Sequence, residues 1–309
     1  MQTPPISLFS PITLNNGLKM PCIGYGTYKL EDPKQRVIEA IRLGYRLIDT
    51  AQLYFNEEQI GEALETLFSS GEIKRQDVFI VTKLWQDQHE DPITSLKTSL
   101  QKLKLDYVDL FLIHWPLGVM NENGIPLKRV PLHILWGNLE KAVSMGLTKS
   151  LGVSNFNAQI LLDLVSYAKI LPVINQVEIH PYFNQKDLVD VCRKLKIELM
   201  AYMPACKGSS ALRYPELMKK HDLFKEEIIL KLSKKYNKTP IQIILNWHLG
   251  KNIIPLPRSN NIEHIKENLE AIAFKMENNE YEEINSLNMN MRLSVGKDKN
   301  FSEGFEIFA

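Results

Sequence analysis

The segment YRLIDTAQLYFNEEQIG, from Tyr45 to Gly61, joins a short apolar run to the start of a helical pattern. The run RLIDT is rich in strand-forming residues and ends near an aspartate, Asp49. From Glu57 to Phe68 the apolar residues recur at the spacing of an amphipathic helix. A strand followed by a helix is the repeating unit of α/β folds. An ionisable acid at the end of a buried strand, shortly before Tyr54, requires an explanation.

The same strand–helix unit recurs along the chain. Counting PCIGYG (21–26) as the first strand, the sequence contains eight strand-like runs: PCIGYG, RLIDT, VFIVTKL, VDLFLIHW, KSLGVSN, INQVEIH, ELMAYMP and NIIPLP. Helical patterns between them cover Gln35–Leu43, Glu57–Phe68, Pro92–Leu103, Leu132–Met145, Ala158–Ala168, Gln185–Leu195 and Lys225–Tyr236. Continuous apolar strands indicate a parallel sheet covered on both faces, which is either an open doubly wound sheet or a closed barrel. Ahead of these units, ITLNNGLKM (12–20) predicts a β-hairpin.

Polar residues gather at the C-terminal ends of these strands, and this distribution favours the barrel. They are Asp49, Lys83, His114, Ser154, Asn155, Gln176 and Tyr202. A (β/α)8 barrel carries its active site at that end of nearly every strand, whereas an open sheet concentrates its polar ends at one switch point. No linker or low-complexity tract divides the chain. We therefore predict a (β/α)8 TIM barrel formed by one domain over residues 1–309.

Composition limits the possible functions. The chain has 309 residues, 44% hydrophobic and 24% charged, with a net charge of +1, which gives no bulk attraction for nucleic acid or a membrane surface. The first residues do not form a signal-peptide pattern, and no apolar stretch reaches the roughly 18 residues of a membrane span. Cys22, Cys192 and Cys206 form neither a zinc-binding spacing nor a disulfide framework. We expect a cytoplasmic protein that binds neither nucleic acid nor membranes.

Four ionisable groups lie at or just after successive predicted strands. Each has a simple structural explanation: Asp49 as a helix cap, Tyr54 as a half-buried aromatic, Lys83 as a side chain that snorkels to the surface at a sheet edge and His114 as a core histidine. Together these explanations are weak, because a barrel brings all four groups into one pocket.

The four groups form a coherent proton donor. A phenol titrates near ~10 in water, and a neighbouring buried ammonium is expected to lower that pKa. A carboxylate keeps the ammonium charged, and an imidazole orients and polarises a carbonyl oxygen. In this interpretation Asp49 stabilises Lys83, Lys83 lowers the pKa of Tyr54, and Tyr54 donates the proton while His114 orients the substrate. The aspartate at the strand end is thereby explained.

The sequence resembles the aldo-keto reductase family along nearly its full length, and it is most similar to the aldose and xylose reductase branch. The resemblance rests on these motifs, which occur in the family's order: LNNGLKMPCIGYGTYKL, GYRLIDTAQLYFNEEQIG, TKLW, DYVDLFLIHWP, GLTKSLGVSNF, NQVEIHPY, KYNKTPIQIILNW and RSNNIEHIKEN. It implies a (β/α)8 barrel whose N-terminal hairpin closes the bottom and whose C-terminal segment borders the substrate. It also implies NAD(P)H-dependent reduction of aldehydes, aldoses or ketones.

The resemblance further implies the site residues. The catalytic tetrad would be Asp49, Tyr54, Lys83 and His114. The cofactor would be bound by Thr27, Lys29, Asp49, Ser154, Asn155, Gln176, Tyr202, Arg258, Ser259, His264, Glu267 and Asn268. The substrate would contact Tyr28, Tyr54, Trp85, His114 and Trp115, with a contribution from residues 301–309. No metal ion is implied.

The cofactor site departs from common dinucleotide motifs and from the family pattern. Gly24 and Gly26 lack the third glycine of a Rossmann fingerprint, because Lys29 stands in its place. Tyr28 stands where the family commonly has a tryptophan. Met203 stands where the family usually has a serine after the tyrosine that stacks on the nicotinamide ring, here Tyr202. At the adenosine end, Arg258 and His264 replace a lysine and an arginine. We expect NADPH to be preferred and NADH to be usable.

Two other functions remain open from sequence. The first is a catalytically inactive barrel that acts as a binding or structural subunit. The second is a metal-dependent hydrolase using His114 and His180, although the strand ends lack a metal-binding cluster. As partners we expect a small-molecule carbonyl substrate and a monomer or weak dimer.

Overall fold

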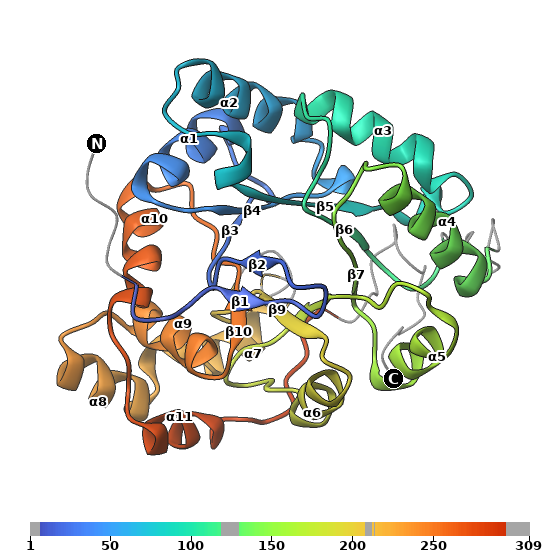
Figure 1. The fold of residues 1–309 in the computed structure, drawn as a ribbon. Helices are drawn as coiled ribbons and strands as arrows, with labels where there is room; N and C mark the ends of the chain where they lie inside the picture. The colour runs from blue at the N-terminus through green and yellow to red at the C-terminus, as the bar shows by residue number, and fades with distance from the viewer. Residues whose placement is uncertain (1–6, 119–129, 208–211, 213, 295–309) are drawn as a thin grey trace.

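Ten short strands, most of them parallel, form the centre of the molecule and helices surround them (Figure 1). The computed structural model describes residues 7–118, 130–207, 212 and 214–294. The strands are β1 (Ile12–Thr13), β2 (Lys19–Met20), β3 (Tyr25–Gly26), β4 (Leu47–Asp49), β5 (Phe79–Leu84), β6 (Leu110–Ile113), β7 (Leu151–Ser154), β8 (Ile174–Glu178), β9 (Glu198–Tyr202) and β10 (Ile253–Pro255). The α-helices are α1 (Pro33–Leu43), α2 (Glu57–Ser69), α3 (Pro92–Leu103), α4 (Leu132–Ser144), α5 (Ala158–Tyr167), α6 (Lys186–Lys194), α7 (Pro215–Lys220), α8 (Glu227–Tyr236), α9 (Pro240–Gly250), α10 (Ile262–Leu269) and α11 (Asn278–Asn285).

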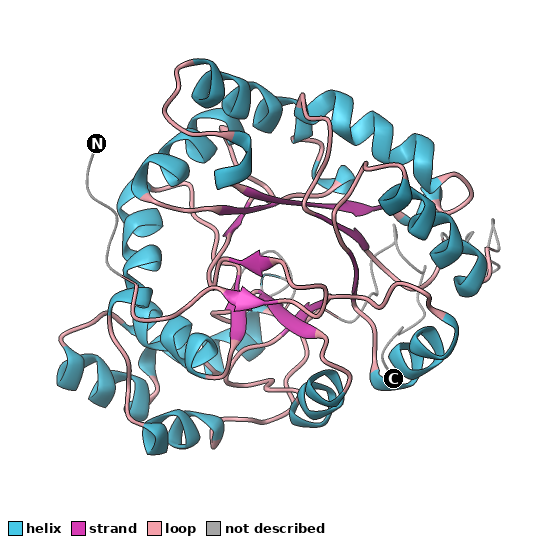
Figure 2. Ribbon diagram, viewed as in Figure 1, coloured by secondary structure: helices cyan, strands magenta, loops and turns pink. Residues whose placement is uncertain are grey.

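Strands β3 to β10 form one parallel sheet in sequence order, and the sheet closes on itself. The amide N–H of Gly24 donates to the Pro255 carbonyl at 3.1 Å, and that of Gly26 donates to the Pro257 carbonyl at 3.0 Å. These two bonds join β3, the first strand of this sheet, to β10, the last. Helices lie around the outside of the sheet, as the colouring in Figure 2 shows. The predicted (β/α)8 barrel is confirmed; the prediction of a single domain over residues 1–309 stays a prediction.

The predicted N-terminal hairpin lies across the bottom of the barrel (Figure 1). Its strands β1 and β2 pair antiparallel, and Gly17 in the turn has a φ of 86°, which glycine adopts without strain. The side-chain amide of Asn15 donates to the carbonyls of Pro172 and Lys196, which precede β8 and β9. These bonds tie the hairpin to the N-terminal ends of the barrel strands.

Strand alternation divides the apolar residues between two layers. On β5, Phe79 and Val81 belong to the cluster inside the barrel, while Ile80 and Leu84 belong to the layer between strands and helices. Because side chains alternate along a strand, Lys83 continues the inward row above Val81. The lower barrel is therefore filled by apolar side chains, and the polar residue of the same row lies at the C-terminal end.

Helix positions agree with the sequence pattern, and the boundaries differ by up to two residues. The start of α1 lies at Pro33 rather than Gln35, because Asp32 caps the helix by accepting from the Gln35 amide and proline fits the first turn. No helix was predicted over Pro240–Gly250, where α9 lies. Residues 242–249 of α9 are all buried, so the helix lacks the one-sided apolar pattern that sequence analysis detects.

Candidate active site

The C-terminal end of the barrel holds an ion pair between Asp49 and Lys83. Asp49 ends β4 and Lys83 lies near the end of β5, and both side chains are buried. Lys83 Nζ lies 2.8 Å from Asp49 Oδ2. Asn56, rather than Asp49, occupies the cap position of the following helix α2. The cap explanation for Asp49 and the surface explanation for Lys83, which is 0% exposed, are both wrong.

Lys83 also contacts the hydroxyl of Tyr54. Its ammonium donates to Asp49 Oδ2, to the Thr50 carbonyl at 2.8 Å and to the Tyr54 hydroxyl at 3.2 Å. Burial lowers the pKa of Lys83, and the charge of Asp49 opposes this shift. Three acceptors match the three N–H donors of a charged ammonium, which supports the protonated form. No described residue accepts the hydroxyl hydrogen of Tyr54, so this hydrogen is available to a bound molecule.

The sequence predicted a lowered pKa for the Tyr54 phenol, and this prediction is wrong in direction. Burial raises the pKa of Tyr54 well above its ordinary value, and the charge of Asp49 adds to this rise. Both effects disfavour the phenolate, although the Lys83 ammonium lies beside the hydroxyl. Tyr54 is accordingly a protonated donor across the neutral pH range. The contact with Lys83 acts when negative charge develops on the phenol oxygen.

His114 follows β6 and lies beside Tyr54. The ring centroids of the two residues are 5.9 Å apart, and the Trp85 ring packs against His114 at 5.1 Å. Burial lowers the pKa of His114 well below its ordinary value, and the charge of Lys83 lowers it further. The imidazole is therefore neutral and can donate one hydrogen bond, since it carries a single N–H. The structure brings Asp49, Tyr54, Lys83 and His114 together.

The residues predicted to bind the nicotinamide form a chain of hydrogen bonds across neighbouring strands. Gln176 on β8 donates through Nε2 to Asp49 Oδ1 at 2.7 Å, and Ser154 Oγ donates to the Gln176 carbonyl at 2.8 Å. The Tyr202 hydroxyl donates to Asn155 Oδ1 at 2.7 Å. The Asn155 side-chain amide also donates to Ser154 Oγ, at 3.2 Å, which connects the two parts of the chain.

Thr27 and Lys29, predicted cofactor contacts, lie in the loop after β3. Thr27 is fully buried, and its hydroxyl donates to the Asp49 carbonyl at 2.9 Å. Lys29 is exposed, and its carbonyl accepts from Arg258 Nη1 at 2.6 Å. This bond places the Arg258 guanidinium next to the backbone of Lys29.

The predicted adenosine-end residues lie before and on helix α10. Ser259 Oγ accepts from the Asn261 amide at 3.0 Å, and Asn261 caps the helix. His264 is exposed in the first turn of α10, and Asn268 is buried near its end. Glu267, which is half-buried, contributes its carbonyl to a bond from Gln242. These residues lie on a segment separate from the tetrad.

Aromatic side chains surround Tyr54 and His114. The Tyr28 ring, 38% exposed, lies 4.9 Å from the Tyr54 ring. Trp85 is half-buried, whereas Trp115 is buried at 4% exposure. The predicted contribution of residues 301–309 lies outside the described residues.

One positioning residue was missed by sequence analysis. Gln52 begins the 3-10 helix Gln52–Tyr54; its Nε2 donates to Ser95 Oγ and Ser99 Oγ, and its Oε1 accepts from the Trp85 amide at 3.0 Å. It therefore connects the Tyr54 loop to helix α3 and to the Trp85 loop. A glutamine between a strand and a helix carries no pattern that distinguishes it from a surface residue.

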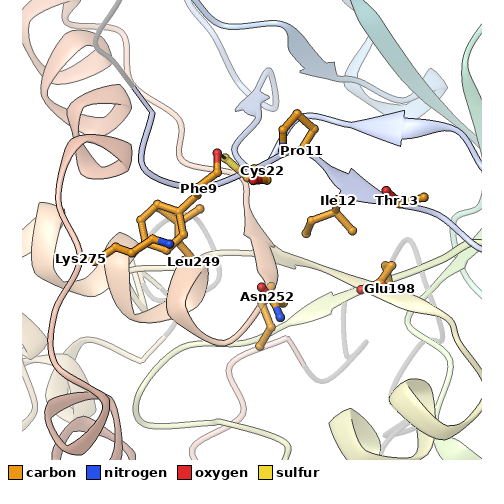
Figure 3. A pocket seen from close by; sticks show the side chains of 11 residues that line it. Phe9, Pro11, Ile12, Thr13, Cys22, Glu198, Leu249, Asn252 and Lys275 are labelled. Atoms are coloured by element: carbon orange, nitrogen blue, oxygen red, sulfur yellow. Dashed lines mark hydrogen bonds between the residues drawn. The ribbon is translucent and has the colours of Figure 1, made fainter.

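A separate cavity of about 360 Å³ lies at the opposite end of the barrel (Figure 3). Its lining includes Phe9 and Cys22 near the hairpin, Glu198 at the start of β9, and Lys275. None of the predicted site residues lines it. Among the described residues, no group of three or more His, Cys, Asp or Glu could hold a metal ion.

Comparison with known proteins agrees with this geometry. The sequence profile described as the Aldo/keto reductase family matches residues 13–289. "Aldose reductase C" of Dictyostelium discoideum is 40% identical over 299 residues, covering 90% of this chain and 89% of that protein. "Aldo-keto reductase family 1 member C2" of Homo sapiens is 38% identical over 304 residues, covering 93% and 94%. A Bombyx mori aldo-keto reductase solved in complex with NADP superposes with a TM-score of 0.85 at 33% identity, covering 97% and 100%.

The chain belongs to the aldo/keto reductase family. The predicted resemblance is thereby confirmed. Within the part of the chain that the structure describes, no helix combines the length and apolar character needed to cross a membrane.

Proposed function

We propose that this protein reduces aldehydes, aldoses or ketones to alcohols with NADPH, and that Tyr54 donates the proton. The observation that carries the proposal is the arrangement of Lys83 between the Asp49 carboxylate and the Tyr54 hydroxyl. The phenol hydrogen of Tyr54 is left for a substrate, beside a neutral His114. Family membership and the NADP-bound Bombyx mori relative support the cofactor.

The residues at the barrel mouth fit a nicotinamide cofactor. A carboxamide group needs both donors and acceptors, and Ser154, Asn155 and Gln176 supply hydroxyl and amide groups at adjacent strand ends. Tyr202 offers an aromatic face next to them. At the other end of the cofactor, the guanidinium of Arg258 can bind a phosphate through two parallel hydrogen bonds. We propose that these residues, with Thr27, Lys29, Asp49, Ser259, His264, Glu267 and Asn268, hold NADPH.

The chain's own residues then perform the proton transfer. NADPH, when bound, would supply the hydride for the carbonyl carbon. His114 donates a hydrogen bond to the carbonyl oxygen and orients it toward Tyr54. Tyr54 transfers its proton to that oxygen as negative charge develops there. Lys83 stabilises the resulting phenolate, and Asp49 keeps Lys83 charged. One hydride and one proton convert the carbonyl into an alcohol.

Oxidation of the reduced cofactor tests the activity. Purified protein is mixed with NADPH and, in separate reactions, an aromatic aldehyde, an aldose, a sugar phosphate or a ketosteroid, and absorbance loss at the reduced nicotinamide band is followed. We expect reduction with at least one substrate class, faster with NADPH than with NADH. Binding of NADPH with no turnover of any class would instead favour the inactive-barrel alternative.

We further propose a cytoplasmic protein that is a monomer or weak dimer. The three cysteines are free in the structure, which suits a reducing compartment. Gel filtration with light scattering over a range of concentrations tests the oligomeric state. A stable tetramer at low concentration would contradict it.

A further inference from the structure

Glu178 is a buried carboxylate at the mouth of the barrel that the proposed mechanism does not use. It ends β8, is 0% exposed, and contacts three nitrogen atoms. Oε1 lies 3.0 Å from His180 Nε2 and accepts from the Leu293 amide at 2.8 Å, and Oε2 accepts from the Ser294 amide at 2.7 Å. A buried carboxylate is stable only when donors of this kind satisfy it. Glu178 therefore holds the backbone at Leu293–Ser294 against strand β8.

The partner of Glu178, His180, is buried with it. A carboxylate only accepts hydrogen bonds, so His180 Nε2 carries the hydrogen between them. His180 is 0% exposed, and its Nδ1 has no hydrogen-bond partner among the described residues. His180 thus adds a third donor to Glu178.

Glu178 lies directly beside Tyr202. The two residues are paired in the parallel register of β8 and β9, and paired residues on adjacent strands point to the same side of the sheet. The negative charge of Glu178 adds to the effect of burial in raising the pKa of Tyr202, and the Ser294 side chain opposes this rise. The Tyr202 hydroxyl in turn bonds to Asn155. Contacts therefore run from Ser294 through Glu178 and Tyr202 to Asn155.

We propose that Glu178 is a positioning residue for the nicotinamide end of the cofactor site. By fixing the Leu293–Ser294 backbone on one side and lying beside Tyr202 on the other, it holds the Tyr202 ring and its bond to Asn155 in place. This inference rests on the proposed function, because Tyr202 and Asn155 are proposed cofactor ligands. Glu178 acts through Tyr202 and need not touch the cofactor.

The variant Glu178→Gln tests the inference with little change in volume. Its amide group has one oxygen, so the amide nitrogen is forced toward a backbone N–H or toward His180 Nε2. The matched control is Glu280→Gln on α11. Glu280 is also buried, at 5% exposure, and accepts from three donors: Lys235 Nζ, the Tyr236 hydroxyl and the Glu277 amide. It lies on α11, which is at the outside of the barrel (Figure 1) and packs against α8 and α9.

Cofactor affinity, measured by protein fluorescence titration with NADPH, is the main readout. We expect Glu178→Gln to raise the NADPH Kd about tenfold, while kcat at saturating NADPH falls by less than about threefold. Glu280→Gln should leave the Kd unchanged. An unchanged Kd in Glu178→Gln would overturn the inference, as would an equal rise in both variants.

A second variant covers the case in which Glu178→Gln does not fold. His180→Phe retains an aromatic ring and removes one of the three donors to Glu178, so the NADPH Kd should rise about threefold. An unchanged Kd in this variant would overturn the inference. Failure of the wild-type protein to bind NADPH would refute the proposed function itself, which separates the two proposals.

Discussion

Asp49 contacts two parts of the site through its two carboxylate oxygens. Oδ2 accepts from Lys83 and Oδ1 accepts from Gln176, so one residue links the proposed proton donor to the proposed nicotinamide ligands. Sequence analysis explained only the first contact. The second depends on β4 and β8 facing each other across the barrel, which no local pattern shows.

Tyr54→Phe should abolish carbonyl reduction and leave cofactor binding nearly intact. A general acid contributes typically about 10²–10⁴-fold to the rate, and the lost hydroxyl acts on the transition state rather than on bound NADPH. Steady-state kcat and NADPH Kd measure the two effects separately. Retention of most of the kcat would show that another group donates the proton.

Lys83→Met should damage kcat about as severely as Tyr54→Phe, whereas Asp49→Asn should be milder. Asp49 acts on the phenol through Lys83, and asparagine can still accept one hydrogen bond from the ammonium. The order of kcat values in the same assay checks this prediction. An Asp49→Asn variant slower than Lys83→Met would indicate that Asp49 has a direct role.

His264 gives a test of cofactor choice. It is exposed in the first turn of α10, close in sequence to Arg258. An arginine at this position would add a guanidinium that is always charged and can bind a phosphate through a planar fork. His264→Arg should therefore bind NADPH more tightly than the wild type does, while NADH affinity stays nearly constant. Fluorescence titrations with each cofactor measure both.

The control for this prediction is NADH, which lacks the 2′-phosphate. An equal change in the affinities for both cofactors, or an arginine variant no tighter for NADPH, would show that His264 does not face the phosphate.

At the level of elements, two glycines within helices test how closely neighbouring helices pack. A Cβ at Gly61 on α2 would lie 2.2 Å from the Lys102 carbonyl oxygen of α3, whereas a Cβ at Gly137 on α4 would meet nothing within 4 Å. Gly61→Ala should lower the free energy of unfolding by about 1–3 kcal/mol or more, because helix backbones must separate. Gly137→Ala should raise it by roughly 0.5–1 kcal/mol, since alanine favours a helix.

Urea unfolding followed by circular dichroism compares both variants with the wild type. The same substitution is expected to have opposite signs at the two positions. A stabilised Gly61→Ala variant would show that α2 and α3 move apart without cost.

The elements also show the limits of sequence patterns. The strand–helix order and most helix ends were predictable, because the outer helices bury one face, and α1, α3 and α5 carry their own capping residues. Helix α9 was not, because it is buried on nearly every side, including Asn246 and His248. Its polar residues are satisfied by distant backbone: Asn246 donates to the carbonyls of Ala271 and Phe274. Only the folded chain reveals these partners.

At the level of the whole molecule, buried histidines make stability depend on pH. Burial lowers the pKa of His89 to about 4 and the pKa of His114 well below its ordinary value. An unfolded histidine titrates near ~6.5, so below that pH the unfolded state binds protons that the folded state does not. The free energy of unfolding should therefore fall as pH decreases from about 6.5 to about 4.

His89→Phe isolates one of these contributions. Its Nε2 has no hydrogen-bond partner among the described residues, so the substitution removes no bond at that atom. From pH 7 to pH 4, the wild type should lose roughly 2–3 kcal/mol more unfolding free energy than the variant does. The reason is that each unit by which folding lowers the pKa of His89 is worth about 1.4 kcal/mol. Urea denaturation at both pH values measures the difference. If the difference in unfolding free energy between wild type and variant is the same at both pH values, His89 is protonated in the folded protein as it is in the unfolded chain.

The sequence by itself determined the barrel class, the polar strand ends and the four residues proposed for catalysis. Strand runs, helix periods and capping residues are local signals, and a parallel barrel necessarily gathers its strand ends at one mouth. The tertiary structure decided the pKa values and the hydrogen-bond partners at that mouth. Burial, which raises the pKa of Tyr54 despite the nearby ammonium, depends on every surrounding residue. The bonds from Asp49 to Gln176 and from Glu178 to the Leu293 and Ser294 amides join residues more than a hundred positions apart, and only the closed barrel brings them within bonding distance.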